Sequence, residues 1–164
     1  MSGIIADNSG RSSGLVKAAG GGGKVLQVVG ALDETTRSLN STSWGAFGNT
    51  MTLTLTPAAT SSKIWLVFHF AMWTGTQNVK SMVYRSIGGA GATALSTRSS
   101  MKADGGNSHH PFSSTAFYDS PNTTSECVYN IYFSVSGSNC VLNRGYNSGY
   151  DGIGQSIAME IDGS

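Results

Sequence analysis

The stretch that decides the fold is residues 50–73, which read TMTLTLTPAATSSKIWLVFHFAMW. In its first part, threonine alternates with Met51, Leu53 and Leu55. This period of two places successive side chains on opposite faces of a β-strand. A Pro-Ala-Ala-Thr-Ser turn then leads into a longer apolar run at residues 63–73. The pattern predicts two consecutive strands, the first of them with one face in water.

The run at residues 63–73 is apolar on both of its faces. One face carries Ile64, Leu66, Phe68, Phe70 and Met72, and the other carries Trp65, Val67, His69, Ala71 and Trp73. A strand in a two-layer sandwich has one inner face, so its second face needs a different cover. The N-terminal residues, a long loop or another subunit could supply it. We favour a subunit, which makes Trp65, Val67, His69 and Trp73 the predicted subunit interface.

The composition of the whole chain favours β-structure. Of the 164 residues, 39% are hydrophobic and 12% are charged, and 62 are Ser, Thr or Gly. So low a charge argues against both solvent-exposed helices and simple disorder. Strand signals bounded by Gly, Pro, Asn or Ser fall near residues 24–30, 41–47, 50–56, 63–73, 77–87, 93–99, 112–119, 126–136, 139–143 and 155–161. They predict an all-β fold, an antiparallel jelly-roll-like β-sandwich of about 8–10 strands.

Three local features refine this prediction. Pro57 and Pro121 each begin a Pro-x-x-Thr-Ser turn before a long apolar strand, as in the two Greek keys of a jelly roll. Gly137-Ser138 predicts a two-residue hairpin loop between the strands at 126–136 and 139–143. Cys127 and Cys140 then share the inner face as buried thiols that lie too far apart to bond.

The first 23 residues differ from the rest of the chain. Two small apolar islands, Ile4-Ile5 and Leu15-Val16, lie in a Ser/Gly background that also contains Arg11 and ends in Gly20–Gly23. Two interpretations stay open, a disordered tail or an arm that becomes ordered on a partner. We therefore divide the chain into a flexible or partner-ordered N-terminal arm at 1–23 and a β-sandwich domain at 24–164.

Several functional classes are disfavoured by charge and by the absence of motifs. A net charge of +1 without clustered Lys and Arg predicts no nucleic-acid partner. We expect no membrane partner, because no apolar run approaches about 20 residues. No secretory signal is visible, which suggests synthesis in a cytoplasm. No nucleophile elbow, Ser-His-Asp spacing or zinc signature occurs, so we expect no enzyme, no metal and no cofactor.

One segment has the composition of a sugar-binding loop. Tyr146 and Tyr150 lie in NRGYNSGYDG, residues 143–152, where their rings could stack on a glycan. A solvent-exposed loop built from turn residues is the alternative interpretation.

Several segments together resemble a family of bacteriophage virion proteins, many of them from viruses of marine and freshwater bacteria. The resembling segments are KVLQVV (24–29), MTLTLTP (51–57), TSSKIWLVFHF (60–70), FYDSP (117–121) followed by Thr123-Thr124-Ser125, and SIAMEIDG (156–163). The opening stretch ADNSGRSSGLVKA (6–18) is similar to the anchoring ends of phage fibres and capsid decorations.

The resemblance implies a jelly-roll domain, usually a homotrimer, held on the virion by its N-terminal arm. We expect a capsid decoration or cement protein on the outer surface of the capsid, because the chain is one small domain plus an arm. Its partner would be the major capsid protein or another virion protein, and the docking residues would be Ile4, Ile5, Arg11, Leu15 and Val16. The alternative is a tail-fibre or baseplate receptor-binding knob at the tail tip, and the third possibility is a secreted lectin-like module.

Overall fold

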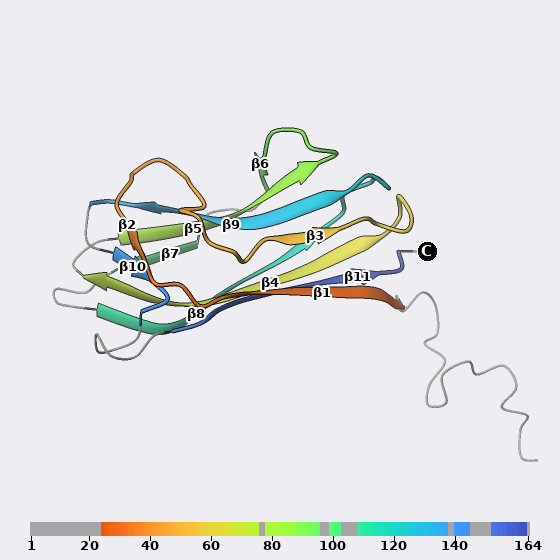
Figure 1. The fold of residues 1–164 in the computed structure, drawn as a ribbon. Helices are drawn as coiled ribbons and strands as arrows, with labels where there is room; N and C mark the ends of the chain where they lie inside the picture. Colours follow the sequence, from red (N-terminus) through yellow and green to blue (C-terminus); the bar gives the residue numbers. More distant parts are fainter. Residues whose placement is uncertain are drawn as a thin grey trace, which may run out of the picture.

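Two layers of antiparallel strands, seen edge-on in Figure 1, make up the part of the chain that the computed structural model describes. The described residues are 24–75, 78–95, 99–102, 108–137, 140–144 and 152–163. Sheet A contains β1 (Val25–Asp33), β2 (Arg37–Leu39), β4 (Lys63–Gly75), β8 (Ser108–Asp119), β10 (Cys140–Leu142) and β11 (Gly154–Ile161). Sheet B contains β3 (Leu53–Leu55), β5 (Asn78–Ile87), β6 (Thr93–Ala94), β7 (Ser99–Lys102) and β9 (Cys127–Val135).

The strand order is that of a jelly roll. Sheet A runs β1–β11–β4–β8, and β10 and β2 extend it beside the far end of β4. Sheet B runs β3–β9–β5, with β6 and β7 both paired to β5. The chain crosses from one sheet to the other at β2–β3, β3–β4, β4–β5, β7–β8, β8–β9 and β9–β10. The predicted all-β jelly-roll sandwich is confirmed.

The core lies between the two sheets and contains the inner faces that the sequence predicted. On β4, the side chains of Ile64, Leu66, Phe68, Phe70 and Met72 are each at most 1% exposed. They face the buried set on β9, which includes Tyr129, Ile131 and Phe133. The rings of Phe70 and Phe133 meet edge to face, with centroids 5.1 Å apart. The alternation in residues 50–56 is also confirmed, since Met51, Leu53 and Leu55 are buried.

The predicted hairpin between 126–136 and 139–143 is wrong. β9 lies in sheet B, whereas β10 lies in sheet A, where Cys140 pairs with Leu39 of β2. The chain therefore crosses between the sheets after Gly137 instead of turning back on β9. Cys127 and Cys140 are nevertheless buried free thiols, and burial raises the pKa of Cys140 to about 11.

Two predicted strands also differ from the structure. The segment 41–47 forms no strand, and Gly45 alone makes a bridge, to Phe133. Phe47 and Gly48 adopt positive φ angles of 52° and 70°, which end any extended run there. Among the described residues of the segment 93–99, Thr93–Ala94 form the two-residue β6, and β7 begins at Ser99. The short strand β2 was not predicted.

A buried carboxylate fixes the turn between β3 and β4. Glu160 on β11 is fully buried and accepts hydrogen bonds from Ser62 Oγ at 2.6 Å, Ala58 N–H at 2.7 Å and Gln27 Nε2 at 2.5 Å. Burial alone would raise the pKa of Glu160, but the hydrogen bonds from Ser62, Gln27 and Ala58 together lower it.

Asp33, the last residue of β1, is a second buried carboxylate that holds neighbouring segments together. Glu160 lies beside Gln27, near the start of β1, so the two carboxylates are at opposite ends of this strand. The Asp33 carboxylate accepts hydrogen bonds from Arg37 Nη1 at 2.5 and 2.6 Å and from the N–H groups of Thr35 and Thr50. Burial acts to raise the pKa of Asp33, but these hydrogen bonds and the Arg37 charge lower it overall. The carboxylate thereby ties β1 to β2 and to the segment that leads into β3.

A third buried carboxylate joins the two sheets. Asp119 on β8 of sheet A accepts hydrogen bonds from Arg85 Nη1 on β5 at 2.7 and 2.8 Å, and from Tyr129 Oη on β9 at 2.8 Å. Burial, together with the neighbouring Asp119 charge, raises the pKa of Tyr129, so its hydroxyl stays a hydrogen-bond donor.

Candidate functional site

The side of sheet A that faces away from the core is the most unusual surface of the described chain. Strand registers align its outward side chains in three rows across β1, β11, β4 and β8: Val28–Met159–Trp65–Tyr118, Gly30–Ile157–Val67–Ala116 and Leu32–Gln155–His69–Ser114. We call these twelve residues the outer face. It contains no Lys, Arg, Asp or Glu.

The outer face exposes large apolar side chains to solvent. The exposed fractions are 59% for Val28 and Leu32, 50% for Tyr118, 44% for Ile157 and 38% for Trp65. These five account for most of the eight large hydrophobic side chains that are exposed in the described ranges. Single exposed hydrophobic residues are ordinary, but a contiguous uncharged patch marks an interaction surface. We therefore take the outer face as the candidate functional site.

The outward side of sheet B has a different character. It carries Lys80 and Tyr84 on β5, and Asn130 and Tyr132 on β9. The Tyr84 and Tyr132 rings stack on each other at 4.2 Å, and Asn130 Nδ2 donates a hydrogen bond to Thr52 Oγ1. Its polar groups and its lysine are typical of a sheet face in contact with water, so the two sides of the sandwich are not equivalent.

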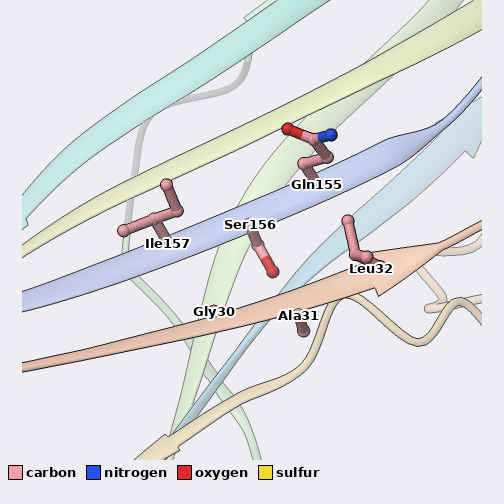
Figure 2. Close-up of a pocket in the computed structure, with 6 residues that line it drawn as sticks. All are labelled: Gly30, Ala31, Leu32, Gln155, Ser156 and Ile157. Carbon is pink, nitrogen blue, oxygen red and sulfur yellow. The ribbon is translucent and has the colours of Figure 1, made fainter.

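A hollow interrupts the outer face between β1 and β11. Its lining comes from two strands, Gly30, Ala31 and Leu32 of β1 and Gln155, Ser156 and Ile157 of β11. Figure 2 shows Leu32, Gln155 and Ile157 projecting to one side of these strands, while Ser156 and Ala31 point to the other. Gly30 contributes no side chain, which leaves the middle row open over β1.

The backbone at Gly30 does not itself require glycine. A Cβ atom built there would have the Ser156 carbonyl oxygen, at 3.4 Å, as its nearest neighbour, an acceptable contact. Its φ angle lies outside the left-handed region that other residues avoid. The missing side chain therefore shapes the surface and does not relieve backbone strain.

The opposite side of the outer face carries two projecting aromatic rings. Tyr118 lies on β8, which is the edge strand of sheet A on that side, and its ring centroid is 6.5 Å from that of Trp65 on β4. The two rings are tilted by 55°, so Trp65 supports one side of Tyr118. In the third row, His69 Nδ1 and Ser114 Oγ lie 2.8 Å apart and satisfy each other.

Three of the four residues predicted for the interface lie together on the outer face. Trp65, Val67 and His69 occupy the β4 position of the three rows. Trp73 lies further along β4, where β10 replaces β11 as the neighbour and the Arg144 guanidinium sits 4.9 Å from the ring centroid of Trp73. The structure therefore separates Trp73 from the other three.

Sequence reasoning missed the contributions of the neighbouring strands. Val28, Leu32, Tyr118 and Ile157 were not predicted, although they are the most exposed apolar members of the outer face. One signal was available, because residues 25–33 are apolar at both odd and even positions, as residues 63–73 are. The cross-strand register that joins them into one surface could not be deduced from the sequence.

Several predicted residues lie outside the described part of the chain. They are the arm residues Ile4, Ile5, Arg11, Leu15 and Val16 and the loop residues Tyr146 and Tyr150. Among the residues that are described, no group of three or more His, Cys, Asp or Glu could hold a metal ion. No helix in that part is long and apolar enough to cross a membrane.

Comparisons with known proteins give similarities among solved structures. No protein-family model matches the chain, and no curated protein matches it in sequence. A structure of Eiger TNF from S. frugiperda is similar over 84% of this chain and 95% of that chain, with 9% identity and a TM-score of 0.47. A chain of infectious bursal disease virus, Gx strain, is similar over 84% of this chain and 36% of that chain, with 21% identity and a TM-score of 0.36. The strand order described above identifies the fold independently of these similarities.

Proposed function

We propose that this protein is a structural, non-enzymatic component of a bacteriophage virion. It forms a trimer on the outer surface of the head, where it decorates or cements the capsid, and residues 1–23 attach it. The observation that carries the self-association is the uncharged outer face, with five large apolar side chains that are 38–59% exposed. The assignment to a phage virion comes from the sequence resemblance described above.

Burial of the outer face offsets the free-energy cost of association. If each of the five side chains loses on the order of 100 Å² of exposed surface, about 25 cal/mol per Å² gives roughly 12 kcal/mol per copy. That gain is comparable to the ~4–15 kcal/mol that association costs in lost motion. If one half of this face on each copy contacts the other half on the next copy, the same contact repeated around a threefold axis closes into a trimer. Every copy then makes both contacts.

The position of the chain ends supports attachment through the first residues. The N–H of Asp162 donates a hydrogen bond to the Lys24 carbonyl at 2.8 Å, so both ends of the described chain lie at one end of the sandwich. Residues 1–23 therefore join the domain at that end, away from the centre of the outer face. A trimer has three such segments, and weak docking by each becomes strong attachment through effective concentration.

Truncation separates attachment from folding and assembly. We expect a chain that begins at Gly20 to melt and to associate nearly as the full chain does, but to fail to bind phage particles that lack the native protein. Ile4→Asp with Leu15→Asp in the full chain should weaken binding in the same way, because charges replace apolar contacts. Sedimentation velocity, thermal unfolding and a particle pull-down are the measurements. Equal decoration by the truncated and full chains would contradict the role of residues 1–23.

Electron microscopy of labelled particles tests the location. Antibody-gold on the head is the expected result. Label at the tail tip would replace this proposal with a receptor-binding knob, and specific binding on a glycan array without particle binding would replace it with a lectin-like module.

A further inference from the structure

We propose that the hollow over Gly30 receives the Tyr118 side chain of a second copy of this chain. The inference rests on the proposed self-association through the outer face and adds the contact that sets its register. The hollow and the projecting ring lie on the same face of every copy, so each molecule offers one of each.

The hollow and the ring lie on opposite sides of the outer face. The hollow is between β1 and β11, whereas Tyr118 is on β8, with β4 between β8 and β11. Two copies can therefore meet with the β8 side of one over the β1 side of the next. The same contact, repeated from copy to copy, is the heterologous arrangement that a trimer requires.

The lining of the hollow matches the chemistry of a tyrosine side chain. Leu32 and Ile157 provide apolar walls, and the amide of Gln155 lies at the rim (Figure 2). A tyrosine ring buries apolar area, but its hydroxyl needs a hydrogen-bond partner once it is removed from water. The Gln155 amide can donate to it or accept from it. Neither the walls nor the ring carries a charge that burial would strand.

Tyr118 fits the hollow better than its neighbour Trp65 does. Tyr118 is 50% exposed and Trp65 is 38% exposed, so a larger fraction of the tyrosine side chain is open to a partner. Trp65 packs against Tyr118 and limits the positions that the ring can take before contact. In this head-to-tail contact each copy divides its exposed apolar side chains between two neighbours, so roughly 500 Å² in total enters each contact, about a third of the ~1,600 Å² in a standard interface.

Filling the hollow tests the contact without disturbing the fold. Gly30→Gln places a polar side chain where the ring would sit, and the backbone accepts a Cβ there. We expect self-association at least tenfold weaker than that of the wild type by sedimentation velocity, with an unchanged thermal midpoint for the dissociated chain. Thr54→Gln, at an exposed position of β3 in sheet B, is the matched control and should associate like the wild type.

Combined variants test whether the two residues meet each other. Tyr118→Ala should weaken association to a similar degree, and the double variant should be no weaker than the worse single variant within about twofold, since both remove one contact. A mixture of the two single variants is the sharper experiment. The Gly30→Gln chain keeps its tyrosine and the Tyr118→Ala chain keeps its hollow, so native mass spectrometry should detect mixed pairs in excess of either variant paired with itself.

The outcomes separate this inference from the proposed function. A wild-type chain that stays monomeric at micromolar concentration overturns both. If the wild type associates but Gly30→Gln has no effect, if the two substitutions are additive, or if mixing restores no pairing, the contact is overturned while self-association stands. If Gly30→Gln unfolds the chain, a Gly30→Ser chain replaces it in the mixture with the Tyr118→Ala chain. An excess of mixed pairs then supports the contact, and no excess overturns it.

Discussion

Glu160 and Asp33 are buried as anions. Burial raises the pKa of each carboxyl, but the hydrogen bonds that each carboxylate accepts together lower it by more. The pKa of each carboxyl is consequently below its ordinary value. A carboxyl group whose pKa is lower in the folded state contributes its full stabilisation at pH values above its unfolded-state pKa, which is about 4.3 for Glu. That contribution is lost as the pH falls through the folded-state pKa.

The charge of Glu160 should therefore make the fold sensitive to acid. Glu160→Gln keeps the shape but loses charge-assisted hydrogen bonds, and we expect it to lower the free energy of unfolding at pH 7 by about 2 kcal/mol. Between about pH 5 and pH 3 the wild type should lose stability more steeply than the variant. Urea unfolding followed by tryptophan fluorescence at several pH values is the measurement. Glu126→Gln, at an exposed position, is the control. An equally steep decline in both variants would assign the acid sensitivity to other groups.

The Asp119 carboxylate should be worth more to the fold than the hydroxyl that donates to it. Asp119→Ala leaves the partly buried Arg85 guanidinium without its partner, so we expect a loss of about 3 kcal/mol in the free energy of unfolding. Tyr129→Phe removes one donor and should cost about 1 kcal/mol. Chemical unfolding of both variants checks the order. A larger loss for Tyr129→Phe than for Asp119→Ala would contradict the assignment of Asp119 as the centre of the link between the sheets.

At the scale of strands, the outer face should respond to charge quite differently from the outward side of sheet B. Ile157→Lys on β11 and Trp65→Ser on β4 should give monomers, since a buried lysine or a lost indole removes the gain from apolar contact. Thr54→Lys, exposed on β3, should leave the molar mass in solution unchanged. Light scattering at micromolar concentration measures all three. If Thr54→Lys dissociates the protein and Ile157→Lys does not, the interface lies on sheet B.

Strands with a strict alternation were predictable because their side chains report which face is buried. Met51, Leu53 and Leu55 alternate with threonine along the chain, and all three are buried as predicted. Pairing was not predictable in the same way. The Gly137-Ser138 dipeptide is a good hairpin signal, but tertiary packing places β9 and β10 in different sheets.

The candidate site was only half visible in the sequence, for a related reason. Trp65 and Val67 are marked by a strand that is apolar on both faces, which one segment reveals by itself. Tyr118 and Ile157 reach the same surface only through the registers of β8 and β11 with β4. The hollow forms because Gly30 has no side chain at its position in the outer face. Its shape depends on the neighbouring side chains of β1 and β11, which the sequence alone does not bring together.

The described domain has a direction, because Lys24 and Asp162, near the two ends of the described chain, lie together at one end of the sandwich. Lys63, at the start of β4, pairs with Ile161 beside that end, and β4 finishes at Gly75. Its 13 residues, at about 3.3 Å each, span roughly 40 Å. Gly75 and Asn78 therefore lie at the opposite end of the sandwich from Lys24 and Asp162.

This polarity makes the domain a one-sided platform for presenting foreign peptides. With the pole at Lys24 turned toward a capsid, an epitope inserted in place of residues 76–77 would stand about 40 Å above the shell and stay open to antibodies. If residues 1–23 attach the domain as proposed, a bulky cargo fused after residue 164 would emerge beside them and crowd the shell. Antibody binding to the insertion at full occupancy, with reduced occupancy for the fusion, would show that the domain stands upright on the particle.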